Sequence, residues 1–276
     1  DLKAEKFDYI IDLHKNLRSY KLKALLKRPS LTFDKLNFKK FFYIHFKIGS
    51  LPKVHIVERY LKSLRPFGIK NDGKGLDYFI PEGETVDTSS YPYEFQNGFI
   101  VWVIGAKHFT KRFPDHKIRE IINDIDKPVV LLGGKEDRER GSWIAGEFYH
   151  VLNKCGDYSL NEAASVIYQS EQVVTNDTGL MHIAAAFDKP VVSLWGNTVP
   201  EFGMYPYYGH DQEKENRLSA IMEVKDLYCR PCSKIGFVKC PEGHFRCMRE
   251  INNDKVVHEI KERETPVKSK VTSSKR

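Results

Sequence analysis

The stretch VVTNDTGLMHIAAAF, residues 173–187, decides the fold of this chain. Its first residues are apolar and β-branched, which predicts a buried strand that ends near Thr175. Asn176 and Asp177 follow as turn and helix-capping residues. The next residues predict a helix with an apolar stripe, formed by Leu180, Ile183, Ala184 and Phe187. The stretch therefore predicts a strand, a tight turn and a helix that begins at the carboxyl edge of a sheet.

The start of this predicted helix is a candidate binding site. Ligands of open α/β sheets bind at the carboxyl edge, where a helix N-terminus offers free N–H groups to an anion. The N–H groups of Thr178, Gly179 and Leu180 would face a phosphate, and Gly179 leaves room for its close approach. In the alternative interpretation, Asp177 only caps the helix and His182 is an ordinary packed or surface histidine.

The chain from residue 93 onward repeats this alternation of strand and helix. Apolar runs predict strands at 99–104, 128–132, 173–175 and 191–195, with a short one near Val151, and helical patterns occupy 115–124, 137–148, 160–169 and 178–187. Strands that are apolar throughout and separated by helices indicate a parallel sheet covered on both faces. We therefore predict an α/β, doubly wound, Rossmann-like domain over residues 93–264.

Two further loops should reach the same edge of this sheet. Gly196, Asn197 and Thr198 follow the strand at 191–195, and small polar residues at that place suit a ligand cleft. Lys111 and Arg112 lie just before another predicted helix, where two cations could clamp a diphosphate. In the alternative interpretation, one of the cations, preferably Arg112, is only solvated.

A third loop, GGKEDRER at 133–140, follows the strand at 128–132. Its Glu136 and Asp137 could accept hydrogen bonds from ribose or sugar hydroxyls. They could equally be the acidic residues that stabilise the first turn of the next helix.

The first 92 residues differ in charge and pattern from the rest. Residues 1–70 contain 17 Lys and Arg against 6 Asp and Glu, a net charge of +11 that leaves −4 for the remainder. Patterning predicts a buried strand at 7–13, an extended piece at 31–33, helices at 17–27, 34–46 and 53–66, and a linker at 82–93. These elements make an incomplete N-terminal Rossmann-like domain. Its basic surface suits phosphates, nucleic acid or an anionic membrane, although lysines on solvated helices need no ligand.

The pattern of apolar residues along the chain bears on its expected location. No run of about 20 apolar residues could span a membrane, and no signal peptide is visible, so we expect a cytoplasmic protein. The tail at 265–276 carries Lys and Arg without acidic residues and is predicted to be disordered.

Four of the five cysteines lie in a Cys-rich segment at 229–247. They are Cys229, Cys232, Cys240 and Cys247, with His244 between the last two. These ligand types suit tetrahedral zinc, but the second pair is wider than in a zinc ribbon. Structural zinc, reduced buried thiols and disulfides all remain open. Cys155 stands alone and is predicted to be structural.

Together these motifs resemble glycosyltransferase family 9, the ADP-heptose:lipopolysaccharide heptosyltransferases. DTGLMHIAAAFDKPVVSLWGNTVPEFGMYPY at 177–207 resembles the donor signature of the family. TKRFP at 110–114 is similar to its basic-aromatic-proline element, and LLGGKEDRE at 131–139 to its second donor loop. DLHKNLRS at 12–19 resembles a segment of the acceptor domain. The resemblance extends to about residue 264, and a similar Cys-rich segment in the family suggests a structural lobe near the cleft.

The resemblance implies a GT-B architecture and a metal-independent, inverting transfer that needs no cofactor. The donor would be a nucleotide-diphosphate sugar such as ADP-heptose, and the acceptor a lipopolysaccharide or other lipid-linked saccharide. Donor contacts of the family fall on Lys111, Asp177, Thr178, Gly179 and His182, with a looser match at Glu136. Arg112, Gly196 and Asn197 complete the predicted donor site.

The acceptor half of the site is less complete. The family carries its catalytic acid in a glycine-containing loop after the first strand, and nothing precedes Asp1 to provide it. We therefore assign no catalytic residue and expect a truncated chain. Basic charge and the resemblance together suggest that His14, Asn16 and Arg18 bind a phosphorylated, lipid-anchored acceptor, with peripheral contact to the anionic cytoplasmic face of the inner membrane.

Two other functions compete with this interpretation. A zinc-containing nucleic-acid-binding protein would use the basic N-terminal region and the Cys-rich segment, but it leaves residues 177–182 unexplained. A dinucleotide-dependent redox enzyme fits the fold but lacks a G-x-G-x-x-G turn after the first visible strand of either domain. The sequence thus favours a glycosyltransferase, and no nucleic acid is expected as its partner.

Overall fold

The computed structural model describes residues 2–263, which divide into two compact units. The small unit comprises residues up to 73 together with 200–204, and the large unit comprises 74–199 and 205 onward. Residues 82–93, predicted as a linker, lie within the large unit and include the 3₁₀ helix η2 (Thr88–Ser90). The tail predicted at 265–276 lies outside the described residues.

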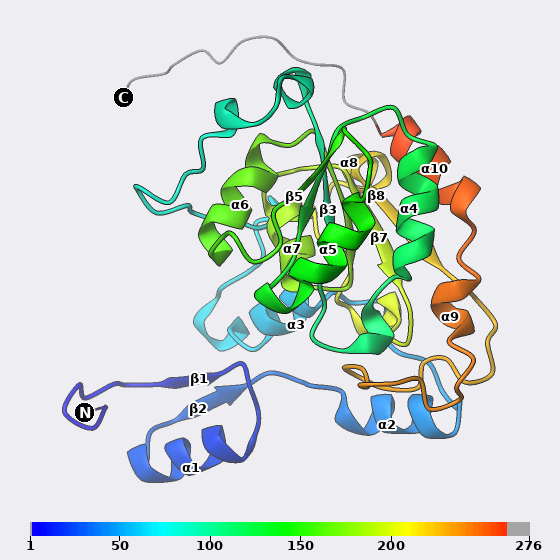
Figure 1. The fold of residues 1–276 in the computed structure, drawn as a ribbon. Helices are drawn as coiled ribbons and strands as arrows, with labels where there is room; N and C mark the ends of the chain where they lie inside the picture. Colours follow the sequence, from blue (N-terminus) through cyan, green and yellow to red (C-terminus); the bar gives the residue numbers. More distant parts are fainter. Residues whose placement is uncertain (1, 264–276) are drawn as a thin grey trace. The chain divides into compact units, whose positions relative to one another are not determined.

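The large unit is built on a six-stranded parallel sheet (Figure 1). Its strands are β3 (Ile100–Val103), β4 (Val129–Leu132), β5 (Val151–Asn153), β6 (Gln172–Asn176), β7 (Val191–Trp195) and β8 (Ser219–Glu223). Every residue of β3, β4, β6 and β7 is buried, because helices cover both faces of the sheet. The predicted doubly wound α/β sheet is confirmed.

Helices alternate with these strands. They are α4 (Asp115–Asn123), α5 (Arg138–Ala145), α6 (Leu160–Gln169), α7 (Gly179–Ala186), α8 (Gln212–Leu218), α9 (Arg246–Arg249) and α10 (Asn253–Glu262). Helix α4 packs against α5 and α10, and α6 packs against α7. The helix predicted at 137–148 is shorter than expected, because the 3₁₀ helix η5 (Lys135–Asp137) precedes it and Gly146 ends it with a positive φ.

The strand order β5-β4-β3-β6-β7-β8 places a switch of direction between β3 and β6. Beyond the carboxyl ends of two such strands, the loops diverge and leave a crevice for ligands. The buried side chain of Asn176 joins the two strand ends. Its Oδ1 accepts a hydrogen bond from the N–H of Phe113 at 3.1 Å, and its Nδ2 donates to the carbonyl of Val103 at 3.3 Å. The loop after β3 is thereby tied to the end of β6.

The small unit contains a two-stranded parallel sheet and short helices. Its elements are β1 (Ile10–Asp12), α1 (Leu17–Leu26), β2 (Ser30–Thr32), α2 (Asn37–His45), α3 (Ile56–Lys62), and the 3₁₀ helices η1 (Arg65–Phe67) and η6 (Pro200–Phe202). The buried strand predicted at 7–13 is wrong in length and burial, since β1 has three residues and Ile11 is 43% exposed. Helix α2 begins three residues later than predicted, because Leu36 adopts a left-handed conformation and its N–H bonds to the side chain of Asp34.

Asp12 is the polar centre of the small unit. Its Oδ2 lies 2.8 Å from Lys23 Nζ, and its Oδ1 accepts the backbone N–H groups of His14 and Lys15. Burial acts to raise the pKa of Asp12, but the hydrogen bonds from Lys23 and from the backbone outweigh it and hold that pKa well below its usual value. This carboxylate therefore organises the turn between β1 and α1.

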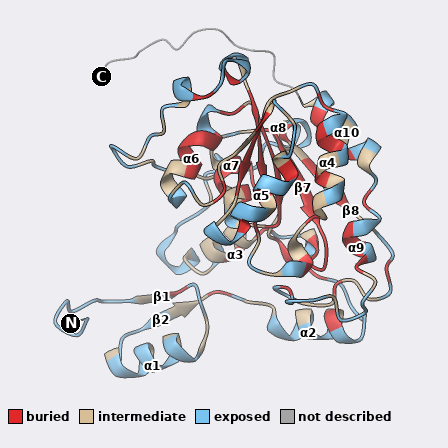
Figure 2. Ribbon diagram, in the orientation of Figure 1, coloured by how far each residue is buried: buried red, intermediate tan, exposed pale blue. Residues whose placement is uncertain are grey.

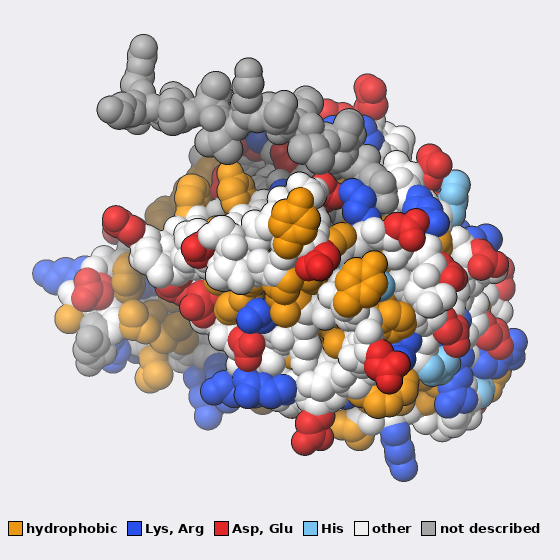
Figure 3. Space-filling model, turned by 45° about the horizontal axis from the view of Figure 1, so that its top comes forward, with side chains coloured by type: hydrophobic (Ala, Val, Ile, Leu, Met, Phe, Trp, Pro, Cys, Tyr) orange, Lys and Arg blue, Asp and Glu red, His pale blue; other side chains and the backbone are white. Residues whose placement is uncertain are grey.

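The surface mixes charge of both signs. On the face drawn in Figure 3, acidic and basic side chains are interspersed and hydrophobic side chains lie between them. Within residues 2–263, none of the helices is both long enough and apolar enough to cross a membrane.

Candidate functional site

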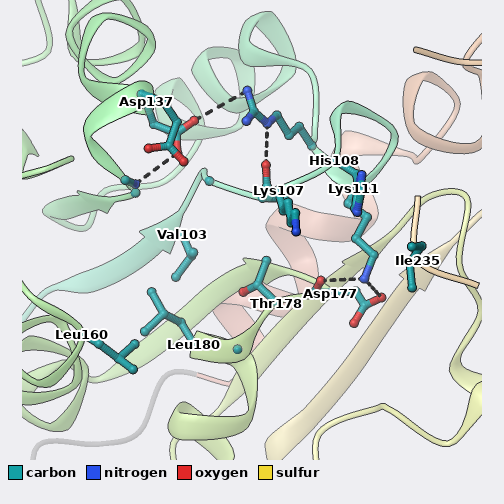
Figure 4. Close-up of a pocket in the computed structure, with 17 residues that line it drawn as sticks. Val103, Lys107, His108, Lys111, Asp137, Leu160, Asp177, Thr178, Leu180 and Ile235 are labelled. Atoms are coloured by element: carbon teal, nitrogen blue, oxygen red, sulfur yellow. Dashed lines mark hydrogen bonds and ion pairs between the residues drawn. The ribbon is translucent and has the colours of Figure 1, made fainter. Parts of the chain in front are cut away.

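A pocket of about 730 Å³ lies in the large unit at the carboxyl ends of β3, β4 and β6 (Figure 4). Its volume is in the usual range for small-molecule sites. The loops after β3 and β4 and the start of α7 line it. Six of the nine residues predicted to bind the donor are among the lining residues: Lys111, Arg112, Glu136, Asp177, Thr178 and Gly179. The structure thus brings together three loops that are distant in sequence.

Lys111 and Asp177 form a half-buried ion pair in this pocket. Lys111 Nζ lies 2.6 Å from Asp177 Oδ2 and 3.2 Å from the Asp177 carbonyl, and Figure 4 shows the two side chains facing each other. The hydroxyl of Thr198 donates to the same Oδ2 at 2.8 Å. Asp177 therefore holds the lysine and does not cap α7, which corrects its predicted capping role.

The N-terminus of α7 opens into the pocket without a side-chain cap. Its N-cap residue is Thr178, whose side chain makes no capping hydrogen bond. The first N–H groups of a helix have no intrahelical partner and carry the positive end of the helix dipole. A Cβ added to Gly179 would meet no protein atom within 4 Å, so the space in front of this helix start is open. An anion could approach the backbone here.

Arg112 is fixed by the loops beside the pocket. Its Nε donates to the Ala106 carbonyl at 2.8 Å, and one of its terminal nitrogens lies 3.8 Å from Asp137 Oδ1. Asp137 is 1% exposed and also binds Arg140 and the N–H of Gly134. Asp137 is therefore committed to protein partners. Glu136 is the exposed carboxylate of this loop that faces the pocket.

The other three predicted donor residues lie outside the lining of this pocket. His182 is half-buried in α7; burial lowers its pKa, with Asp177 acting to raise it and Lys111 to lower it. Gly196 and Asn197 are buried, and the N–H of Asn197 donates to the Thr110 carbonyl at 3.4 Å. They pack behind the loop that carries Lys111. Their direct contact with a donor stays a prediction.

The residues predicted to bind the acceptor lie in the small unit. Asn16 caps α1, because its Oδ1 accepts the N–H of Ser19 at 2.9 Å. His14 and Arg18 are exposed at the turn before α1 and in its first turn. The structure thus explains Asn16 as a helix cap, and the binding of an acceptor by all three stays a prediction.

The Cys-rich segment lines one side of the pocket through Ile235, and no disulfide joins its cysteines in the part of the chain that the structure describes. Cys229 Sγ lies 3.8 Å from His244 Nε2, but no group of three or more His, Cys, Asp or Glu in residues 2–263 could hold a metal ion. The structure therefore supports neither the zinc nor the disulfide alternative. Burial raises the pKa of the Cys247 thiol to about 12, which makes it a protonated, unreactive thiol at neutral pH.

Sequence reasoning missed Ile235, which only tertiary contacts bring to the site, and it did not predict that Thr198 binds Asp177. Ile235 reaches the pocket from the Cys-rich segment, and the hydroxyl of Thr198 reaches Asp177 from the loop after β7. The sequence placed Thr198 at the ligand edge of the sheet together with Gly196 and Asn197, but it did not indicate which residue its hydroxyl binds. For Ile235 the sequence offers no local indication.

This chain is similar to proteins of a known family. The model of glycosyltransferase family 9 (heptosyltransferase) matches residues 1–228. "Lipopolysaccharide heptosyltransferase 2" of Salmonella typhimurium is 30% identical over 164 residues, which cover 53% of this chain and 47% of the relative. The chain thus spans about half the length of the curated relatives it matches.

Solved structures share the fold. A glycosyl transferase family 9 structure from Veillonella parvula has a TM-score of 0.71 and 22% identity, covering 94% of this chain and 74% of that one. The structure of E. coli ADP-heptose lps heptosyltransferase II has a TM-score of 0.65 and 22% identity, covering 94% and 77%. These matches confirm the predicted α/β fold of GT-B type.

Proposed function

Because this chain belongs to glycosyltransferase family 9, we propose that it transfers a sugar from a nucleotide-diphosphate donor to a lipopolysaccharide or related glycolipid acceptor. The relatives named lipopolysaccharide heptosyltransferase support a heptose as that sugar and ADP-heptose as the donor. Inversion at the transferred carbon is part of this proposal and follows from the resemblance to the family.

The observation that carries the proposal is the Lys111 ammonium held beside the open N-terminus of α7. Lys111 Nζ is fixed at 2.6 Å from Asp177, and the start of α7 lacks a side-chain cap. A cation and a helix dipole directed at one place stabilise the negative charge that develops on a departing diphosphate. This arrangement supports a leaving-group site that works without a metal ion.

The remaining contacts of the donor are assigned by their place in the pocket. Arg112 supplies a second positive charge close to the diphosphate position, and the exposed Glu136 accepts hydrogen bonds from ribose or sugar hydroxyls. The lipid-linked acceptor is assigned to His14, Asn16 and Arg18, with peripheral contact to an anionic membrane. These assignments are part of the same proposal.

Nucleotide binding by the intact chain tests the donor site. We expect ADP to raise the melting temperature of the wild type, and Lys111→Ala to weaken ADP binding about ten- to hundredfold in isothermal titration calorimetry. The loss of a charge-assisted hydrogen bond accounts for this magnitude, at about 1.5–3 kcal/mol.

Lys127→Ala is the matched control for this experiment. Lys127 Nζ lies 2.6 Å from Glu171 Oε2, the same separation as in the Lys111 pair, and neither residue lines the pocket. Lys127→Ala should leave ADP affinity within about twofold of the wild type. If ADP, UDP and GDP all fail to change the melting temperature of the wild type at millimolar concentration, the proposed donor site is wrong.

A further inference from the structure

Arg230, between Cys229 and Cys232, has a buried guanidinium with four polar contacts. It donates to Glu223 Oε2 at 2.7 Å and to the carbonyls of Gly196 at 2.7 Å, Thr198 at 2.9 Å and Val224 at 3.2 Å. The Arg230 and Glu223 side chains are 7% and 10% exposed. A buried charge is tolerated only when it is paired and hydrogen-bonded, and these contacts satisfy that condition.

These contacts continue to the pocket through Thr198. The carbonyl of Thr198 binds Arg230, and its hydroxyl donates to Asp177 Oδ2 at 2.8 Å. Asp177 in turn holds Lys111 Nζ at 2.6 Å. Thr198 is 1% exposed and Asp177 is 9% exposed, so water does not compete strongly for these bonds. A continuous hydrogen-bonded path thus runs from Glu223 to Lys111.

A second set of contacts fixes the backbone next to Lys111. Three hydrogen bonds join Thr110 and Phe237. The N–H and the hydroxyl of Thr110 donate to the Phe237 carbonyl at 3.2 and 3.3 Å, and the N–H of Phe237 donates to Thr110 Oγ1 at 2.8 Å. A Cβ added to Gly196 would lie 2.6 Å from the Thr110 carbonyl oxygen, so the loops after β3 and β7 pack directly against each other. The Cys-rich segment therefore contacts both loops that determine where Lys111 lies.

We propose that Arg230 is a positioning residue of the donor site, which fixes the turn at Gly196–Thr198 so that Asp177 directs the Lys111 ammonium at the diphosphate. The proposal rests on the proposed function, because it assigns Arg230 to the same site. Arginine suits this place because its forked donors reach a carboxylate and three carbonyls at once. A lysine side chain has one nitrogen and cannot bind all four of these acceptors.

The ratio of ADP to adenosine affinity tests this role. Arg230→Lys keeps the charge but loses most of the contacts, and Thr198→Val removes only the hydroxyl that binds Asp177. We expect both variants to bind ADP about tenfold more weakly, since small displacements of a positioned group have large effects. Adenosine, which has no phosphates, should bind them as it binds the wild type. If Arg230 had a merely structural role, the variants would weaken the binding of ADP and adenosine equally, or the binding of neither.

Arg263→Lys is the matched control. Arg263 also pairs with a carboxylate, Glu259, and donates to the carbonyls of Asn216 and Ser219, and none of these residues lines the pocket. Its substitution should leave the ratio of the two affinities unchanged. If Arg230→Lys does not fold, Thr198→Val decides the test by itself.

The reactivity of Lys111 supplies a readout that needs no donor. Acetylation of the intact protein, measured residue by residue by mass spectrometry, should modify Lys111 several-fold faster in both variants, because the ammonium is less firmly paired. Lys127 serves as the internal reference. If the wild type binds ADP but neither the affinity ratio nor Lys111 acetylation changes in the variants, the positioning role is wrong and the proposed function stands. If no nucleotide binds but Lys111 acetylation rises, the proposed function fails and Arg230 still positions Lys111.

Discussion

The two units of this chain differ in what covers their strands (Figure 2). In the large unit, every residue of β3, β4, β6 and β7 is buried. In the small unit, Asp12 is the one buried residue of β1 and β2, and no residue of α1 is buried among those the structure describes. Hydrophobic contacts on both faces determine the strand positions of the large unit, whereas hydrogen bonds around one carboxylate organise the start of the small unit.

This difference explains why the binding geometry is better defined in the large unit. Lys111 and Asp177 lie on loops that follow buried strands, and these strands cannot shift without exposing apolar surface. Their separation of 2.6 Å is therefore supported by the whole sheet. The residues of the small unit that were assigned to the acceptor lie on a turn and an exposed helix, where polar bonds supply the order.

The largest expected effect comes from the core of the large unit. Leu131 in β4 is fully buried, and Leu131→Ala should lower the free energy of unfolding by about 2–5 kcal/mol, because it removes buried methyl groups and leaves a cavity. All three tryptophans, Trp102, Trp143 and Trp195, lie in the large unit, so tryptophan fluorescence during urea unfolding reports this unit. A loss below about 1 kcal/mol would show that the sheet does not depend on its buried strands.

A smaller effect is expected at the polar centre of the small unit. Asp12→Asn removes the charge that binds Lys23 and the backbone N–H groups, so it should destabilise residues 9–33 by about 1–3 kcal/mol at pH 7. Hydrogen exchange of those amides, followed by mass spectrometry, measures the change. The tryptophan-reported transition of the large unit should stay as in the wild type.

The pH dependence of this effect has a defined sign. The pKa of Asp12 is depressed in the folded protein, so its contribution is fully present above the ordinary carboxyl pKa of about 4. It is lost as the pH falls from there through the depressed folded pKa. The difference between wild type and Asp12→Asn should therefore be constant from pH 7 to about pH 5 and shrink below pH 4. A difference that grows on acidification would contradict the assignment.

The same contrast determines how much of the fold the sequence could predict. Strands β3, β4, β6 and β7 were located because continuous apolar runs indicate strands buried on both faces. Strand β8 was missed because it alternates: Ala220 and Met222 are buried, whereas Ile221 is 38% exposed. In the small unit, the apolar run at 7–13 predicted burial, but burial depends on which surfaces cover a strand, and local sequence does not contain that information.

The site shows the same limit. The sequence placed Lys111 and Asp177 at one sheet edge, because both follow strands that were predicted to be parallel. It did not predict that Asp177 binds Lys111, which lies 66 residues away, since a turn followed by a helix is equally typical of a capping aspartate. Arg230 was overlooked for a different reason. The cysteines on either side of it suggested metal chemistry, whereas in the structure it is the arginine between them that binds the loop after β7.

The smallest effect is expected at Leu17, the first residue of α1. Leu17→Ala is the same chemical change as Leu131→Ala, but Leu17 is 82% exposed, and alanine favours helices slightly more than leucine does. The cap formed by Asn16 and Ser19 does not involve the Leu17 side chain. The free energy of opening of residues 17–26, measured by hydrogen exchange, should therefore change by less than about 0.5 kcal/mol. A loss above 1 kcal/mol would mean that another surface covers this leucine in the folded protein. The two units would then differ because a partner surface covers the small unit, and not because the small unit has fewer internal apolar contacts.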